Sequence, residues 1–244
     1  MRSYLTLGSV LILASALAYS YEALSATAGD GPAGYVTAPT EEVVLFDGTN
    51  LDEWNFFTEA SGVKRDELLT VKDGVLGIPG QPSGYLATRR WYRDYALDLD
   101  WRWPGERGGN SGVLVHTTAP FIFYTWPRSI EVQLQAGSAG DFWVIGDGVE
   151  LWVENMDTRR AKPVEGDLHT HRRIANLTDG SEHPIGEWNH MRIESRGDTL
   201  HVWVNGELVN EAKDCTVTEG AISLQSEGTA IEFRDVRVGP LQYR

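Results

Sequence analysis

The sequence of 244 residues predicts an all-β protein, a two-sheet antiparallel jelly-roll β-sandwich. Short segments in which apolar and polar residues alternate with period two recur along the chain, and Gly, Asn and Asp turns separate them. No stretch sustains the 3.6-residue period of an amphipathic helix. Many short strands at regular spacing are typical of sandwiches, because each strand then buries one face against a second sheet.

The first 28 residues are expected to be an export signal. Arg2 supplies a positive charge, an apolar core follows that is shorter than the roughly 20 residues of a membrane span, and Ala26-Thr27-Ala28 resembles a cleavage site. Residues 29–41 are rich in Gly, Pro, Ala and Thr, which favours a flexible tether. The folded domain is therefore expected over residues 42–244, in an exported protein, periplasmic or extracellular, with no membrane span in its mature part.

The composition argues against several classes of partner. The formal net charge is -14 and the sequence pI is about 4.8, and no Lys or Arg cluster is present that would attract nucleic acid or anionic lipid. A single cysteine, Cys215, allows no internal disulfide, so the core alone has to stabilise the fold. Nine Trp are present, and some of them are expected to line a carbohydrate-binding surface, whereas Trp91, Trp101 and Trp188 are expected in the core.

In chain order, an apolar run at residues 43–46 predicts the first strand of the domain. Asp73-Gly74 then predicts a tight hairpin between strands at residues 69–72 and 75–78. Residues 95–103 alternate clearly, with aliphatic and Trp residues on one face and Asp and Arg on the other, as in a half-buried strand.

The second half of the chain continues this pattern. Asn205-Gly206 predicts another tight hairpin, and Arg196-Gly197-Asp198 joins two more strands. The strands of this half are expected at residues 191–195, 200–204, 207–209, 221–225 and 231–238. Residues 149–184 are an exception, because they are charged and weakly periodic, and they form either a functional loop or an excursion with its own small strands.

The strongest functional signal lies at residues 129–135. Glu131, Gln133 and Gln135 alternate there with apolar residues, so one face of the expected strand carries a carboxylate and two amides. Such a face is often simply solvated. Here, however, the side chains offer donors and acceptors without an excess of like charge, which favours a ligand groove. His116 ends the neighbouring apolar run.

Seven motifs spread over the mature chain, in order, resemble those of one family. They are Leu45–Trp54, Gly109–Val113, Glu131–Gln133, Gly186–Asn189, Val202–Gly206, Gly220–Ser226 and Phe233–Val238. Together they resemble the 3-keto-disaccharide hydrolase domain, formerly a domain of unknown function, of the concanavalin A-like lectin/glucanase superfamily. The resemblance implies a two-sheet jelly roll whose concave face binds sugar, and activity in some members on glycosides oxidised at C3.

The chemistry that the resemblance implies needs one base. A ketone at C3 acidifies the proton at C2, so that a base removes this proton and expels the C1 substituent, with water added back later. Glu131 is the predicted base. His116 is predicted to be the proton donor or a ligand of a divalent metal that polarises the ketone, and a purely structural role for it is an equal alternative. Hydrolysis by paired carboxylates, with Asp141 as the second acid, is disfavoured because Gln133 and Gln135 occupy the partner positions.

Other residues are expected to contact the sugar. Hydrogen bonds are expected from Asn110, Gln133, Gln135 and Gln225, and stacking from Trp126, Trp143 and Trp203. His169, His171, His183 and His190 do not match a standard zinc spacing, so the sequence leaves the cofactor unknown, with a divalent metal as one possibility. The sequence thus predicts an exported enzyme that cleaves 3-keto-glycosides. A non-catalytic carbohydrate-binding domain and an interaction domain without a sugar role remain as alternatives.

Overall fold

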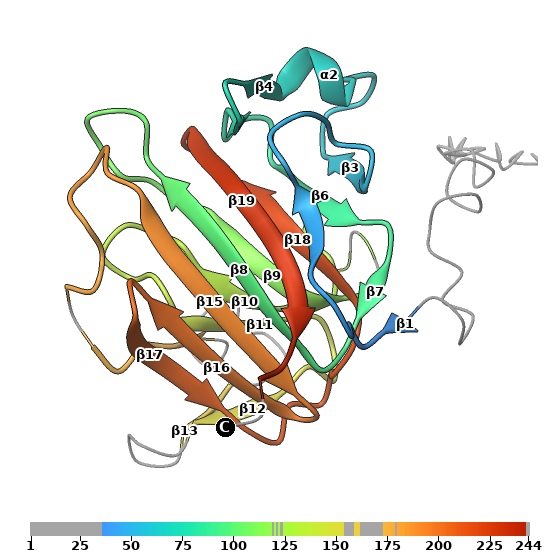
Figure 1. The fold of residues 1–244 in the computed structure, drawn as a ribbon, viewed down its shortest axis with the longest axis vertical. Coiled ribbons are helices and arrows are strands. Elements are labelled where there is room, and N and C mark those ends of the chain that lie inside the picture. The colour runs from blue at the N-terminus through green and yellow to red at the C-terminus, as the bar shows by residue number, and fades with distance from the viewer. Residues whose placement is uncertain are drawn as a thin grey trace, which may run out of the picture. The chain divides into compact units, whose positions relative to one another are not determined.

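The structure is a computed structural model that describes residues 36–242, except 119, 121, 123, 154–158, 162–172 and 179. Two antiparallel sheets form two layers, and Figure 1 shows β8, β15, β16 and β19 in front of β9, β10 and β11. The first sheet contains β3 (Trp54–Thr58), β6 (Gly84–Thr88), β9 (Gly112–Thr117), β10 (Ser129–Gln133), β11 (Phe142–Ile145), β14 (Arg173–Ile174) and β18 (Ala221–Ser226). Its seven strands have the order β14-β11-β10-β9-β18-β6-β3.

The second sheet has eight strands. They are β2 (Val43–Phe46), β4 (Thr70–Lys72), β5 (Val75–Ile78), β8 (Tyr95–Arg102), β15 (Asn189–Arg196), β16 (Thr199–Val204), β17 (Glu207–Ala212) and β19 (Ile231–Pro240). Their order is β17-β16-β15-β8-β19-β5-β4, and β2 pairs with β19. Both predicted hairpins are confirmed, because Asp73 and Asn205 have positive φ angles of 52° and 50° and the glycine after each is also left-handed, as tight two-residue turns require.

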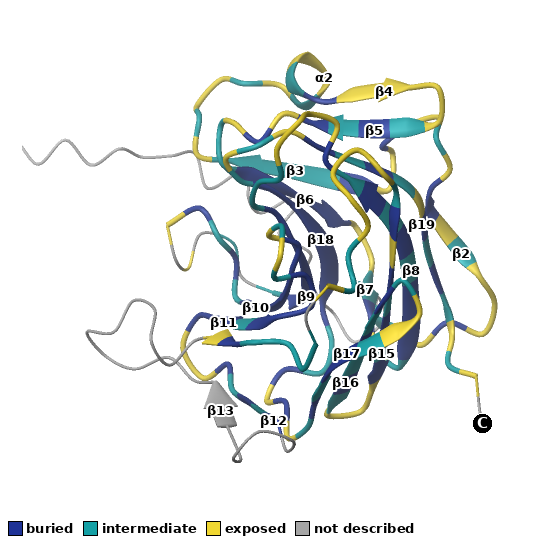
Figure 2. Ribbon diagram, turned by 90° about the vertical axis from the view of Figure 1, so that its left-hand side faces the viewer, coloured by how far each residue is buried: buried dark blue, intermediate teal, exposed yellow. Residues whose placement is uncertain are grey.

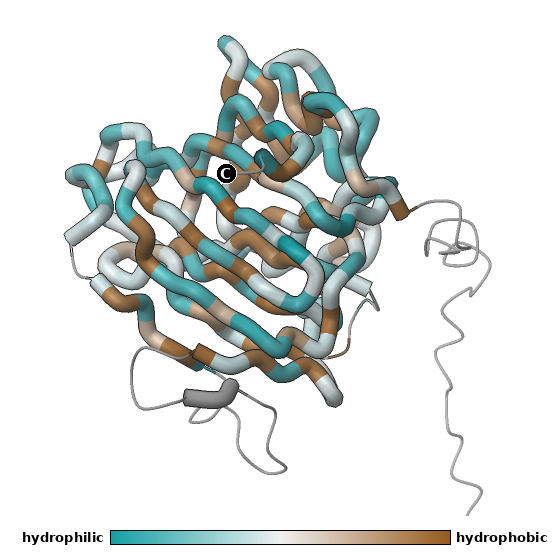
Figure 3. The backbone as a smooth tube through the Cα atoms, turned by 60° about the horizontal axis from the view of Figure 1, so that its bottom comes forward, coloured by the Kyte–Doolittle hydropathy of each residue, from teal (hydrophilic) through white to brown (hydrophobic). Residues whose placement is uncertain are grey.

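The core lies between the two sheets. Ile130 and Val132 of β10 and Ile222 and Leu224 of β18 all have no exposed surface and belong to this core, as the alternation predicts. Figure 2 shows the buried strands of both layers, and Figure 3 shows hydrophilic and hydrophobic residues alternating along the strands. This alternation leaves each sheet with an outer face that is free to carry polar groups.

Two details differ from the sequence-based expectation. The end of the expected tether, β1 (Val36–Thr37), pairs in parallel with β7 (Trp91–Tyr92). A four-residue helix, α2 (Arg65–Leu68), precedes β4. The segment 149–184 has small strands of its own, which is one of its two expected alternatives. In its described part, β12 (Leu151–Val153) and β13 (Arg159–Ala161) form a two-stranded sheet, and β14 joins the seven-stranded sheet.

Trp101 lies in the core as expected, but Trp188 does not. The guanidinium groups of Arg102 and Arg234 both lie over the Trp188 ring, 4.5 and 4.1 Å from its centroid. Trp188 is only half-buried, so its stabilisation comes from cation–π contacts rather than from the inter-sheet core. In the part of the chain that the structure describes, no helix has the length and apolar character to cross a membrane. The expected export signal lies outside the described residues.

Candidate functional site

The outer face of the seven-stranded sheet, which we call the Glu131 face, carries the candidate site. Glu131 is the direct cross-strand partner of Leu114 on β9 and of Trp143 on β11, and Gln225 on β18 is the partner of Tyr85 on β6. Partners in antiparallel strands point to the same side of a sheet, and their neighbours along the chain fill the core. Figure 2 shows this sheet curving from β3 to β11. The structure therefore brings Glu131 and Gln225 to one curved face.

Gly112 lets two polar side chains meet over the middle of this face. A Cβ atom at Gly112 would lie 2.6 Å from Oε1 of Glu131 and 2.6 Å from Oε1 of Gln225. Both distances are shorter than ordinary contacts, so a side chain at position 112 would have to displace both groups. The glycine of the Asn110-Ser111-Gly112 sequence thus makes room for the oxygens of Glu131 and Gln225.

The Glu131 carboxyl group is buried without a hydrogen bond. Only 6% of the residue is exposed, and no hydrogen bond from the described part of the chain reaches its carboxyl group. Burial raises the pKa of Glu131 well above its usual range, and the negative charges of Glu227 and Asp141 raise it further. An isolated buried carboxyl group costs stability, so its presence indicates a role in binding or chemistry.

Glu227 is a residue of this site that the sequence analysis missed. It follows the end of β18, at the position where the alternation of Ser223 and Gln225 would continue on the same face. Burial raises the pKa of Glu227, and a hydrogen bond from the Asn110 side chain lowers it in part. Gln225-Ser226-Glu227 mirrors Glu131-Val132-Gln133, and this repeated spacing of carboxylate and amide is the signal that could have found Glu227.

Several polar atoms on the Glu131 face are buried without a partner among the described residues. They include Oε1 of Gln225, Oδ1 of Asn110 and the hydroxyl group of Tyr85. Gln225 and Tyr85 are each 1% exposed. Buried polar atoms nearly always have hydrogen-bond partners in native proteins, so a cluster of exceptions indicates a place where a ligand supplies the partner. A molecule rich in hydroxyl groups would satisfy such a cluster.

Asp141 is not available as a second catalytic acid. Its buried carboxylate receives hydrogen bonds from Nε of Arg173 at 2.6 Å and from the backbone N–H of Asn176 at 2.7 Å. Glu182 is engaged as well, because it accepts hydrogen bonds from the backbone N–H groups of Gly137 and Ala139 in the turn between β10 and β11. Both carboxylates therefore stabilise loops.

Two of the three predicted stacking residues lie on the Glu131 face. Trp143 does so as the partner of Glu131, and Trp126 packs against a cluster that contains Tyr85 and Ala87. Trp203 does not, because Val202 and Val204 fill the core and Trp203 therefore points outward from the other sheet. Trp203 is therefore not part of the Glu131 face, where the sequence analysis expected it, and its ring stacks on His201, with 5.9 Å between centroids.

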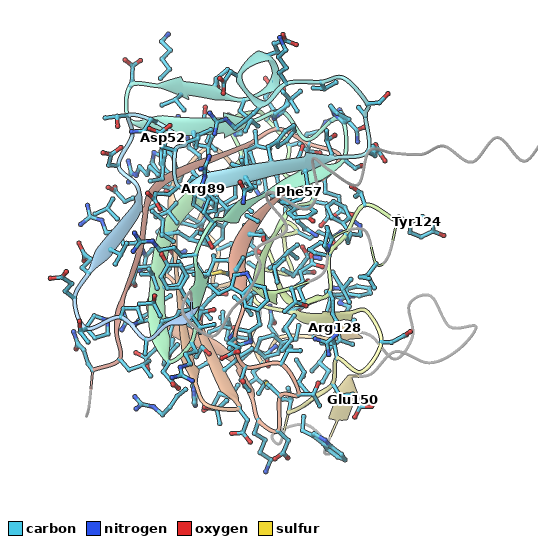
Figure 4. The ribbon with its side chains drawn as sticks, turned by 90° about the vertical axis from the view of Figure 1, so that its right-hand side faces the viewer. Asp52, Phe57, Arg89, Tyr124, Arg128 and Glu150 are labelled. Atoms are coloured by element: carbon cyan, nitrogen blue, oxygen red, sulfur yellow. The ribbon has the colours of Figure 1, made fainter. Side chains whose placement is uncertain are left out.

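Aromatic surface continues beyond the strands. Phe57 on the edge strand β3 stacks on Tyr85 with 4.9 Å between ring centroids. Tyr124 lies in the loop between β9 and β10, and Figure 4 shows its side chain projecting away from the sheets on the same side as Phe57. The Glu131 face thus combines carboxyl groups, amides and rings, which is the combination that sugar recognition uses.

His116 lies in the core and not beside Glu131. The pairing of β9 with β18 shifts its register between Leu114 and Thr117, and His116 has a φ angle of 55° there. This bulge turns the imidazole inward, where Nδ1 donates to the carbonyl oxygen of Val217 at 2.8 Å and Nε2 accepts from Oγ of Ser195 at 3.0 Å. Burial lowers the pKa of His116 to about 4, so it is a neutral structural histidine, and the prediction that it donates a proton to the leaving group is wrong.

The two predicted glutamines of β10 have different positions. Oε1 of Gln133 accepts the backbone N–H groups of Leu134 and Gln135, both at 2.9 Å, so its carbonyl end stabilises the end of the strand. Gln135 lies after β10 has ended and is exposed in the following turn. The alternation predicted for Gln135 is wrong at this point, because the chain turns after Leu134.

The histidines give no metal site in the described part of the chain. His169 and His171 lie outside the described residues, and His183 is exposed. His190 forms hydrogen bonds with the carboxylates of Asp100 and Asp98 at 2.9 and 3.2 Å on the other sheet. Among the described residues, no group of three or more His, Cys, Asp or Glu is placed to bind a metal ion.

A cavity of about 440 Å³ lies elsewhere, at the edge of the seven-stranded sheet between β3 and α2. Its lining includes Lys64, Arg65, Asp66 and Arg89. Arg65 is already used, because it donates to the carbonyl oxygen of Leu51 at 2.8 Å and binds Asp66. The cavity has charges of both signs and no buried unpartnered group in its lining, so the Glu131 face is the stronger candidate.

Comparisons with known proteins identify the family and the fold of this chain. The sequence profile of the 3-keto-alpha-glucoside-1,2-lyase-like domain matches residues 41–239. A candidate glycosyl hydrolase from Parabacteroides distasonis ATCC 8503 is 25% identical, with a TM-score of 0.57, over 83% of this chain and 100% of that chain. A search of curated proteins finds no match.

Two further solved structures share the fold at low identity. Carbohydrate binding module CBM66 from Bacillus subtilis is 12% identical, with a TM-score of 0.51, over 76% of this chain and 94% of that chain. A non-specific endo-beta-1,3(4)-glucanase of family GH16 is 12% identical, with a TM-score of 0.54, over 84% of this chain and 97% of that chain. The predicted fold class, a two-sheet antiparallel sandwich of the concanavalin A-like lectin/glucanase type, is confirmed.

Proposed function

The chain belongs to the 3-keto-alpha-glucoside-1,2-lyase-like family, and on this premise we propose that it cleaves the glycosidic bond of 3-keto-glycosides at the Glu131 face. One observation carries the proposal. Among the described residues, no group forms a hydrogen bond with the buried carboxyl group of Glu131, and none with Oε1 of Gln225 or Oδ1 of Asn110 nearby. Such an arrangement costs stability in the free protein and is useful only when a ligand fills it.

In this proposal Glu131 is the base that removes the proton at C2. A raised pKa makes its ionised form a stronger base, which suits the removal of a proton from carbon beside a ketone. Hydroxyl groups of the sugar donate to Oε1 of Gln225 and Oδ1 of Asn110, and Trp143 packs on the apolar patches of the ring. The elimination expels the substituent at C1.

Export is part of the proposal. Residues 1–28 have the composition of a signal peptide, which supports export. The alternative is a carbohydrate-binding domain without catalysis. CBM66 has the same fold, but a shared fold does not imply a shared activity, so this similarity does not decide between catalysis and binding.

The experiment compares glucosides that differ only at C3. The purified protein is incubated with 3-keto-glucosides and with the unoxidised glucosides, with and without a chelator, and release of the C1 substituent is measured. We expect cleavage of the keto compounds only, because the C2 proton is acidic only there. Binding of both sugars without cleavage of either, with any divalent metal supplied, would establish the binding domain instead.

The Glu131→Gln variant tests whether Glu131 is the base. We expect turnover to fall by a factor of about 10² to 10⁴ while sugar affinity is kept, because the amide preserves shape but cannot take the proton. Glu232→Gln is the matched control, since Glu232 pairs with Arg102 on the opposite sheet at 2.6 Å. A Glu131→Gln variant with wild-type turnover would disprove its role as the base.

A further inference from the structure

We infer that Glu227 is a second catalytic residue, which protonates the departing oxygen at C1 while Glu131 removes the proton at C2. This inference rests on the proposed function, because it assigns the missing proton donor of that reaction. His116 cannot fill the role, since both ring nitrogens are occupied in the core. Expulsion of a sugar alkoxide without a proton is slow, so the reaction needs such a donor.

The backbone around Glu227 is built to hold it in place. The backbone of Asn110 pairs with that of Glu227 and Gly228 in single β-bridges, and the Asn110 side chain donates to the Glu227 carboxylate. A Cβ atom at Gly109 would lie 2.1 Å from Cβ of Thr229, so the loop before β9 packs directly on the residues after Glu227. Two segments that are distant in sequence thereby fix Glu227 at the edge of the Glu131 face.

The other nearby carboxylates are already occupied. Asp141 binds Arg173, and Glu182 accepts backbone N–H groups of the turn after β10. Within the part of the chain that the structure describes, Asn110 is the one side-chain partner of the Glu227 carboxylate, and Glu227 is half-buried, so it keeps access to a ligand on the face. Of the described carboxyl groups that influence the charge of Glu131, Glu227 is the one free to exchange a proton.

The two glutamates favour a state with one proton between them. Burial raises the pKa of both, and the charge of Glu227 raises that of Glu131 further. Two carboxyl groups that share a partly desolvated site do not both ionise easily, so the pair holds one proton over a range of pH. The pKa of Glu131 is raised more strongly, and the hydrogen bond from Asn110 favours the ionised form of Glu227, so in the free protein this proton lies mainly on Glu131. The reactive form is the one in which the proton has moved to Glu227. An acid and a base are then present together, which is the requirement of the proposed elimination.

The elimination leaves the number of protons on Glu131 and Glu227 unchanged. The C2–H bond breaks and its proton goes to Glu131, and the electron pair forms a C1–C2 double bond conjugated with the C3 ketone. The C1–O bond breaks, and the departing oxygen takes the proton of Glu227. Glu131 gains the proton that Glu227 loses, so the pair holds one proton before and after the step. Addition of water at C1 would use the same transfers in reverse.

The test uses two leaving groups that differ in their need for a proton. Methyl 3-keto-α-glucoside releases a poor leaving group, whereas the 4-nitrophenyl compound releases a phenolate that departs without protonation. For Glu227→Gln we expect turnover of the methyl compound to fall by about 10² to 10⁴ and turnover of the 4-nitrophenyl compound to fall by less than about tenfold. For Glu131→Gln we expect both to fall, because both need removal of the C2 proton.

A pH profile gives a second readout. An acid has to be protonated, so kcat/KM of the wild type for the methyl compound is expected to decline at high pH. The 4-nitrophenyl reaction of Glu227→Gln is expected to lack this decline. Thermal unfolding and sugar binding of both variants, with Glu232→Gln as the control, show whether they remain folded.

Equal losses on both leaving groups would overturn the inference and make Glu227 a positioning residue. Unchanged turnover of the methyl compound would overturn it as well. These outcomes are distinct from failure of the proposed function, in which the wild type cleaves neither keto-glucoside and the assignment of Glu227 falls with it.

Discussion

The outer faces of the two sheets both carry acidic residues, but the surroundings of these acids are opposite. On the eight-stranded sheet, Asp98 binds Arg192 at 2.6 Å and His190 at 3.2 Å, and Asp100 binds His190 and Arg234. We call this surface the Asp98 face. Burial raises the pKa of Asp98, but the hydrogen bonds from His190 and Arg192 outweigh it, so the net pKa is lowered. Each of these acids is neutralised within the fold.

On the Glu131 face the opposite holds. Glu131 has no cation or donor beside it in the described part of the chain, and the nearby charges that act on it are negative. Arg173 is bound to Asp141 and therefore does not neutralise Glu131. Charge on a sheet surface is therefore not itself a functional signal. The signal is a buried acid that the fold leaves unpaired, because folding alone gives no reason to keep it.

The largest effect is expected from filling the space above Gly112. Gly112→Ala puts a methyl group 2.6 Å from the oxygens of both Glu131 and Gln225, so both groups have to move. Because misplacement of catalytic groups by about 1 Å can cost about 10²-fold in rate, we expect at least this loss of turnover on a 3-keto-glucoside. The same assay on Gly105→Ala is the control, since a Cβ at Gly105 meets nothing closer than 4.0 Å.

A Gly112→Ala variant with unchanged turnover would contradict the convergence of Glu131 and Gln225 into one site. Thermal unfolding separates this result from simple overpacking. The insertion is expected to cost about 1 to 3 kcal/mol of unfolding free energy, which leaves most of a typical domain folded. Activity measured on the folded fraction therefore reports on the site itself.

Alternation along β10 was sufficient to predict which way Glu131 points, because strand geometry fixes the side of every second residue. The same rule failed at His116. One extra residue in β9 between Leu114 and Thr117 shifts the register and reverses the imidazole, and nothing in the local sequence marks this bulge. Bulges depend on pairing with a partner strand, which one segment of sequence does not contain.

The prediction for Trp203 named the wrong face for a different reason. Alternation correctly predicts that Trp203 points away from the core, but it does not say to which of two sheets the strand belongs. Glu227 was missed because it lies past the last apolar residue of its strand, where Gly228 makes the chain look like a turn. Its contact with Asn110 joins segments more than a hundred residues apart, and such contacts become visible only in the folded protein.

A smaller effect is expected on sugar binding, and it differs between a Trp of the Glu131 face and a Trp of the Asp98 face. Trp143→Ala is expected to weaken binding of the 3-keto-glucoside by about 1 to 3 kcal/mol, by analogy with the measured energy of aromatic stacking on bases. Trp203→Ala is expected to leave binding unchanged, because Trp203 lies on the Asp98 side and stacks on His201. Equilibrium titration of both variants measures the difference. Equal weakening by the two substitutions would contradict the placement of the sugar on the Glu131 face.

The smallest effect is on stability, and its sign differs between the faces. The pKa of Glu131 is raised on folding, so the folded state binds its proton more tightly than the unfolded state does. The free energy of unfolding therefore falls as pH rises from the ordinary carboxyl pKa to the raised one, at about 1.4 kcal/mol per pH unit for one group. Glu131→Gln is expected to remove this fall, so that its stability relative to the wild type improves as pH increases.

Asp98→Asn is expected to show the reverse. The pKa of Asp98 is lowered on folding, so its contribution is present above the ordinary carboxyl pKa and is lost as pH falls through the lowered one. With 32% of its side chain exposed, we expect a loss of only about 1 kcal/mol at neutral pH, shrinking in acid. Urea unfolding of both variants at several pH values measures how the unfolding free energy changes with pH. A difference in packing that is the same at every pH does not alter this slope. If Glu131→Gln and Asp98→Asn changed the slope in the same direction, Glu131 would be a paired acid like those on the Asp98 face, and the physical reason for assigning it the chemistry would be lost.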